Sequence, residues 1–164
     1  MFKSQAAVEY LTTYGWAILI IAIVIAALYS VGLFNPTALI GNTCAFPADF
    51  SCLAATLFPS GNFVVNIQQA TAAAINVTAI GCNSDSSTSN MIQFGGPARI
   101  YIPIGGNSSF TMLCYSNGVP YNSPFPSNTV PLGTLFKGYI VVNYTNLQTG
   151  FPHTVIGRLI QKVA

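Results

Sequence analysis

The longest uncharged stretch of the sequence lies near its N-terminus. It runs from Leu11 to Phe34 without a charged side chain, and its centre, residues 15–29, is almost entirely apolar. A helix needs about 20 consecutive apolar residues to cross the hydrocarbon core of a bilayer. Because hydrocarbon offers no hydrogen-bond partners, the backbone of such a segment must pair within itself, which favours a helix. We therefore expect a long hydrophobic transmembrane helix over residues 5–34, ended by the constraint that Pro36 places on the residue before it.

The residues at the start of this stretch form a specific pattern. Gln5 is followed by three uncharged residues and then by Glu9, at the edge of the apolar run. An ionised carboxylate is costly inside a membrane and favours a cationic partner, whereas at headgroup level the helix N-terminus would stabilise it. The stretch from Lys3 to Ala17 resembles the class III signal peptide and first helix of archaeal type IV pilins. Ordinary secretory signals differ, because their cleavage site follows the apolar run.

This resemblance implies a processing site and a route of assembly. A leader peptidase would cut between Ser4 and Gln5 and remove residues 1–4, so that Glu9 becomes the fifth residue of the mature chain. The subunit would then wait in the membrane until a pilus-assembly platform adds it to a filament. There Glu9 would pair with the amino terminus of a neighbouring identical subunit and set the register between them.

Small residues in the predicted helix indicate where copies of it approach one another. Moving a helix from lipid into a bundle of identical helices exchanges one apolar environment for another, so close packing must supply much of the stabilisation. Gly15, Ala22 and Ala26 would allow such close approach. A head-to-tail contact that does not close on itself produces an open helical filament.

The remainder of the chain has the pattern of a β-structure. Residues 35–60 are predicted to be a linker, and residues 61–164 a single extracellular domain. Alternating or β-favouring runs separated by glycine- and proline-rich turns predict strands over 63–67, 74–80, 99–102, 110–115, 135–144 and 154–163. Strands at this spacing suggest an immunoglobulin-like sandwich. The predicted fold class is therefore α+β, a long N-terminal hydrophobic helix followed by an all-β immunoglobulin-like sandwich.

The cysteines indicate an oxidising compartment. Lys3 precedes the apolar run, and positively charged flanks stay in the cytoplasm, so we expect everything after the helix to lie outside the cell. Four cysteines then allow two disulfides in three possible pairings. We favour Cys44–Cys52, which would close a short loop in the linker, together with Cys82–Cys114.

The surface of the predicted domain is unusually poor in charge. Charged residues make up 5% of the chain, against about 25% in typical soluble domains. N-glycans would keep such a surface soluble, and contacts between subunits would cover it. The sequence contains three acceptor motifs for N-glycans, at Asn76, Asn107 and Asn143.

Several classes of function find little support in the sequence. A net charge of +2 without a Lys/Arg cluster argues against nucleic acid as a primary partner. There are three acidic residues and one histidine, His153, which follows a proline and reads as a strand-edge residue. These offer little material for acid–base or triad catalysis, so we expect no enzyme. The cysteine spacing lacks a Cys-x-x-Cys pair, so neither a metal nor another cofactor is expected.

The expected function is therefore that of a structural subunit of an archaeal type IV pilus. Its helices would form the filament core and its β-domains an outer sheath that adheres to surfaces or cells. Two alternatives remain open at this stage. The chain could be a monomeric membrane-anchored adhesin whose helix is only a tether, or a minor pilin that caps or decorates a filament.

Overall fold

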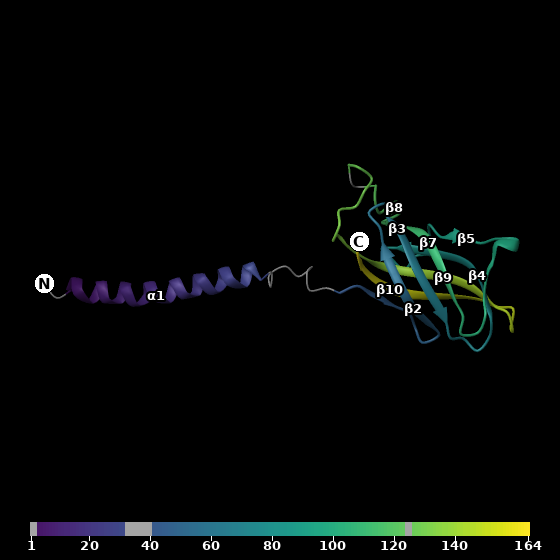
Figure 1. The fold of residues 1–164 in the computed structure, drawn as a ribbon, viewed down its shortest axis with the longest axis horizontal. Coiled ribbons are helices and arrows are strands. Elements are labelled where there is room, and N and C mark those ends of the chain that lie inside the picture. Colours follow the sequence, from purple (N-terminus) through teal and green to yellow (C-terminus); the bar gives the residue numbers. More distant parts are fainter. Residues whose placement is uncertain (1–2, 32–40, 124–125) are drawn as a thin grey trace. The chain divides into compact units, whose positions relative to one another are not determined.

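The computed structural model describes residues 3–31, 41–123 and 126–164 (Figure 1). Within the helix, the side chains of residues 3–7, 9–11 and 13 lie outside this description. The chain divides into two compact units, Met1–Ile40 and Gly41–Ala164.

The first unit contains helix α1, Lys3–Ser30. The hydroxyl of Thr12 donates to the carbonyl of Val8 at 3.0 Å, and that of Ser30 to the carbonyl of Ala27 at 2.7 Å, so both polar groups are satisfied within the helix. A serine hydroxyl that donates to a carbonyl of the preceding turn competes with the backbone hydrogen bonds of a helix. Ser30 is the last residue of α1.

The prediction of a long helix over residues 5–34 is wrong. The uninterrupted part of α1 whose side chains the structure describes is residues 14–30, a short helix of about 17 residues, and α1 ends at Ser30. The predicted final residues, 32–34, lie outside the described part of the chain. Among the described residues, no helical segment combines the length and the apolarity that a bilayer span requires.

The second unit is built from strands. Their bounds are β1 Thr43–Ala45, β2 Phe50–Leu57, β3 Asn62–Gln69, β4 Ile75–Asn83, β5 Ile92–Gln93, β6 Ile100–Ile102, β7 Asn107–Ser116, β8 Val119–Pro120, β9 Leu135–Asn146 and β10 Pro152–Lys162, with a 3-10 turn at Gly96–Ala98. All six strands expected from the residue pattern are confirmed, as β3, β4, β6, β7, β9 and β10. On β3 the alternation is visible as burial, because Phe63, Val65 and Ile67 are buried and the residues between them are not.

The immunoglobulin-like sandwich is also a wrong prediction, because the strands form one sheet that curls nearly closed on itself. Its order is β1-β10-β9-β4-β7-β3-β2. Strand β7 joins the two halves: its residues up to Leu113 pair with β3, and Cys114 and Tyr115 then pair in parallel with β4. At the opposite side Val163 forms a bridge with Leu57. Hydrogen bonding therefore continues where two separate sheets were expected.

The predicted linker, residues 35–60, includes part of the sheet. The second compact unit begins at Gly41, and β1 and β2 both lie before residue 61. Phe50 and Leu57, at the two ends of β2, are 4% and 0% exposed. Burial of such side chains contributes about 1.5 to 3 kcal/mol each, so this segment belongs to the domain and helps to form its core.

Both predicted disulfides, Cys44–Cys52 and Cys82–Cys114, are confirmed. Each lies where the curled sheet is weakly hydrogen-bonded. Cys82–Cys114 joins β4 to β7, which share two residue pairs, and Cys44–Cys52 joins the edge strands β1 and β2. The two bonds thus cross-link the two seams of the sheet.

Candidate functional site

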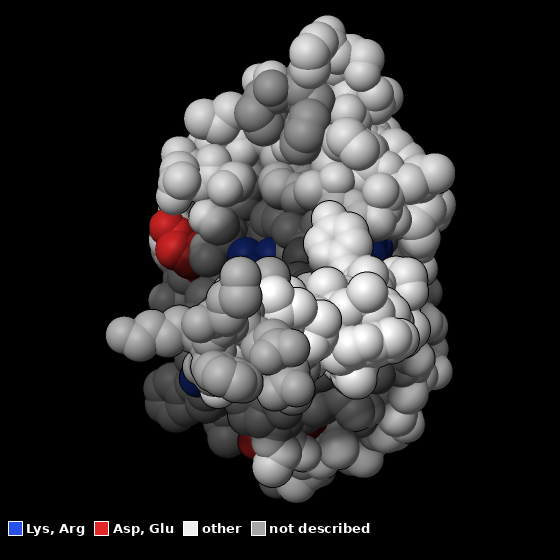
Figure 2. Space-filling view, turned by 90° about the vertical axis from the view of Figure 1, so that its left-hand side faces the viewer, with Lys and Arg blue, Asp and Glu red and all other residues white. Residues whose placement is uncertain are grey.

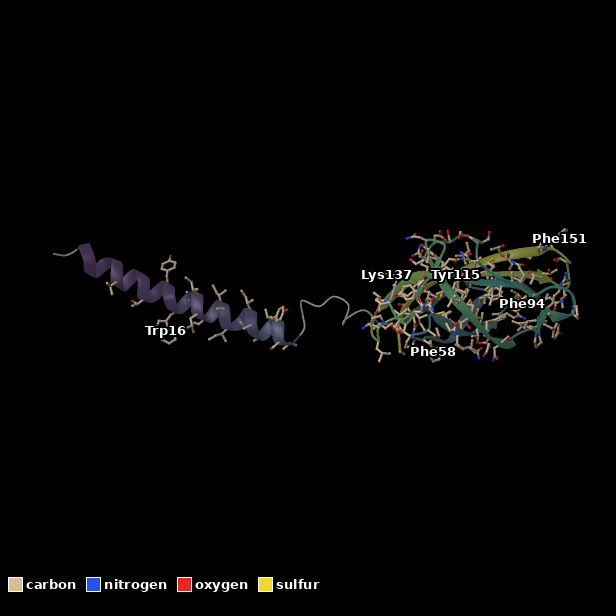
Figure 3. All side chains as sticks on the ribbon, turned by 90° about the horizontal axis from the view of Figure 1, so that it is seen from above. Trp16, Phe58, Phe94, Tyr115, Lys137 and Phe151 are labelled. Atoms are coloured by element: carbon tan, nitrogen blue, oxygen red, sulfur yellow. A yellow bond between two sulfur atoms is a disulfide. The ribbon has the colours of Figure 1, made fainter. Side chains whose placement is uncertain are left out.

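Helix α1 presents apolar side chains in every direction. Trp16, Ile18 and Ile23 are 70%, 65% and 59% exposed, and Figure 3 shows side chains projecting from both sides of the helix. Because successive residues are about 100° apart around a helix, the exposed run of residues 18–21 covers all faces. A helix that is apolar all round is normally buried in protein or lipid.

The three small residues predicted to pack in the assembly lie on one face of α1. Gly15, Ala22 and Ala26 are spaced by seven and four residues, which returns to the same side of an α-helix, and all three are exposed. Beside Gly15 is a notch of about 240 Å³ lined by Thr12, Trp16 and Leu19. A Cβ atom added to Gly15 would meet nothing within 4 Å. This face therefore allows a neighbouring backbone or side chain to approach closely.

Three other predicted residues of this unit lie outside what the structure describes. Ser4, Gln5 and Glu9 fall within the bounds of α1, but their side chains are not among the described ones. Leader cleavage between Ser4 and Gln5, and pairing of Glu9 with a neighbouring subunit, therefore stay predictions.

The predicted glycan acceptors differ in accessibility. Asn107 is exposed at the first position of β7, whereas Asn76 and Asn143 are half-buried on β4 and β9. The side chain of Asn143 is also engaged, because its Nδ2 contacts the Met91 sulfur at 3.8 Å and its Oδ1 accepts a hydrogen bond from Thr154 at 2.8 Å. Accessibility therefore favours Asn107 as an acceptor.

The single histidine lies in an aromatic cluster at one end of the second unit. The ring of His153 stacks on that of Tyr144, with centroids 5.4 Å apart, and the Phe50 ring lies 5.2 Å from Tyr144 on centroid distance. Burial, with a further contribution from the Asp49 carboxylate, raises the pKa of Tyr144. Among the described residues, no three His, Cys, Asp or Glu side chains gather as a set of metal ligands. The cluster is therefore best explained as aromatic packing.

Charged side chains are sparse, as one face of the molecule shows (Figure 2), but two cations are brought together on β9 and β10. The register pairs Arg158 with Tyr139, and Lys137 with Ile160. These four residues share one face, because cross-strand partners and residues two apart point to the same side of a sheet. Lys137 lies at the opposite end of the second unit from Phe151 (Figure 3).

These cations line a pocket of about 390 Å³. Its wall is formed by Ser84, Lys137, Gly138, Tyr139, Arg158, Leu159 and Ile160, and we call it the basic pocket. The sequence pattern does not reveal this pocket, because Lys137 and Arg158 are far apart in the chain and no Lys/Arg cluster marks them. The antiparallel pairing of 135–144 with 154–163, had its register been known, would have revealed it.

Comparisons with protein-family models and with curated proteins gave no match to this chain. The resemblance to type IV pilins therefore rests on the N-terminal residues alone.

Proposed function

We propose that this chain is a structural subunit of an archaeal type IV pilus. In this proposal α1 packs against the same helix of neighbouring copies to form the core of a filament. The β-domain then forms the outer layer and carries adhesion to surfaces or cells. The leader peptidase, the assembly platform and the membrane-inserted precursor are further partners and states that the resemblance implies.

The observation that carries the proposal is the apolar surface of α1. Its described side chains are exposed on all faces, including large ones such as Trp16 and Ile18. Leaving them in water would forgo about 1.5 to 3 kcal/mol for each large side chain. Copies of the same helix would cover this surface, and the small-residue face at Gly15, Ala22 and Ala26 provides a place for close packing.

The two disulfides support an extracellular location. Such bonds form and persist in oxidising compartments and are rare in the cytosol. Cys82–Cys114 is fully buried, with both residues 0% exposed, as expected of a structural bond. An outer sheath exposed to the environment would benefit from this cross-linking.

Electron microscopy of the full chain, produced with its processing and assembly machinery, tests the proposal. We expect helical fibres that contain the chain, and we expect Ala22→Leu/Ala26→Leu to abolish them, because larger side chains keep neighbouring helices apart. Glu9→Gln should also abolish them by removing the charge that the resemblance assigns to subunit pairing.

Ala17→Leu is the matched control. Ala17 is exposed on α1 but lies about 200° around the helix from Gly15, so this variant should still form fibres. Normal fibres from Ala22→Leu/Ala26→Leu, or loss of fibres in all variants alike, would contradict packing through the small-residue face. A wild-type chain that stays monomeric on cells would favour the tethered adhesin instead.

A further inference from the structure

The basic pocket combines two positive charges with groups that suit a sugar. Arg158 and Lys137 are exposed, and Tyr139 and Ser84 are half-buried. Arg158 and Tyr139 are direct cross-strand partners, and Lys137 lies diagonally across from Arg158. Such neighbours on one face of a sheet are about 5 and 7 to 8 Å apart, respectively. All four side chains can therefore reach one small molecule.

The charges of Lys137 and Arg158 are uncompensated within the described part of the chain, where neither residue takes part in an ion pair. Asp85 follows Ser84 directly, but its carboxylate accepts a hydrogen bond from the backbone N–H of Ser87 at 3.1 Å. The Ser87 hydrogen bonds also lower the pKa of Asp85. Asp85, the nearest acid in the sequence, therefore stays ionised and is held within its own loop by Ser87, and it forms no ion pair with Lys137 or Arg158 in the described part of the chain.

The chemistry of these four residues matches a carboxylated sugar. A guanidinium group binds a carboxylate through two parallel hydrogen bonds, and an ammonium group adds a second point charge. The hydroxyls of Ser84 and Tyr139 can bond sugar hydroxyls, and an aromatic ring provides a flat apolar surface beside them. A pocket of about 390 Å³ lies within the usual range for small ligands, roughly 300 to 1,000 Å³.

We infer that the basic pocket binds a uronate-type sugar residue of an acidic polysaccharide. The two cations that line the pocket, with Lys162 further along the same face of β10, are few for a nucleic acid, whose affinity depends on many phosphate contacts. A single sugar carboxylate, in contrast, can bond Arg158 and lie near Lys137. The inference rests on the proposed function for its biological meaning, since it identifies what an adhesive sheath would hold. Binding itself requires no filament.

Calorimetric titration of the full chain, dispersed in a non-ionic detergent, tests the inference. The probes are trigalacturonate, its fully methyl-esterified form and a short single-stranded DNA. We expect trigalacturonate to bind, and esterification to weaken binding at least tenfold because it removes the carboxylate charge. Arg158→Gln and Lys137→Gln should each weaken binding roughly tenfold or more, as expected when a hydrogen bond to a charged group is lost. Arg158→Lys should retain part of the affinity, because it keeps the charge but not the paired hydrogen bonds.

Arg99→Gln is the matched control, since Arg99 is an exposed cation outside the pocket. It should change the affinity less than twofold. The inference is overturned if trigalacturonate does not bind at millimolar concentration, if the ester binds equally well, if DNA binds more tightly, or if Arg99→Gln is as damaging as the pocket variants. None of these outcomes depends on fibre formation, so failure here leaves the proposed pilus subunit standing, and absence of fibres leaves this test intact.

Discussion

Gly138 lies where strands β9 and β4 come very close. A Cβ atom built on it would be 2.3 Å from the carbonyl oxygen of Asn83 and 2.8 Å from the Phe136 ring. Ordinary carbon contacts are about 3.5 to 4.0 Å. Because the closest atom belongs to the backbone, it cannot rotate away as a side chain would. Gly138 therefore permits the strand spacing beneath the basic pocket.

We predict that Gly138→Ala destabilises the protein by about 1 to 3 kcal/mol, the usual effect of forcing extra atoms into packed structure. The free energy of unfolding should be measured by urea denaturation with the disulfides intact. Gly95→Ala serves as the control, because a Cβ at Gly95 meets nothing within 4 Å. Equal stability of the two variants would show that the strands separate at little cost.

The candidate site residues differ in how far they could be predicted. The disulfide partners could be predicted because four cysteines in an oxidising compartment allow only three pairings. The small-residue face of α1 could be predicted because the position of a residue around a helix depends on its number alone. The basic pocket could not be predicted, because the proximity of Lys137 and Arg158 depends on the register between β9 and β10. The alternation of apolar and polar residues does not determine that register.

Among the elements, strand positions followed from alternation but the architecture of the sheet did not. The linker predicted over residues 35–60 contains β2, whose alternation is broken. Its pairing with β3 shifts between Cys52 and Ala54, which leaves Leu53 as an extra, exposed residue. Strand β7 gave no sign that it changes partner near its end. Because β7 pairs first with β3 and then with β4, the strands form one sheet and not the two that were predicted.

The two disulfides should contribute unequally to stability. Cys82–Cys114 spans 32 residues and Cys44–Cys52 spans 8. A longer closed loop restricts the unfolded chain more, by about 1 kcal/mol for this ratio, within typical contributions of about 2 to 4 kcal/mol. The longer bond also supports the seam between β4 and β7, which share two residue pairs.

We therefore predict that Cys82→Ala/Cys114→Ala lowers the free energy of unfolding more than Cys44→Ala/Cys52→Ala does. Urea denaturation followed by far-ultraviolet circular dichroism measures both double variants against the wild type. A larger loss from the Cys44–Cys52 pair would mean that the seam between β1 and β2 is the critical one.

At the scale of the whole molecule, the described hydrophobic core and the exposed apolar side chains of α1 belong to different units. Every described member of the hydrophobic core lies between Phe50 and Val163, inside the second compact unit. The exposed large apolar side chains of α1 belong to the first. The β-domain thus has its own core and both disulfides, while α1 carries large apolar side chains that are exposed.

This division predicts how a fragment of residues 41–164 behaves. Secreted into an oxidising compartment, it should fold with both disulfides formed and stay monomeric, because the core and the cross-links are complete without α1. The full chain at the same concentration should self-associate, since burial of the α1 side chains favours contact between copies. Sedimentation velocity measures the two association states, and mass spectrometry of unreduced peptides confirms the disulfides. If the fragment associates as strongly as the full chain, assembly is driven by the β-domain, and the role proposed for α1 is wrong.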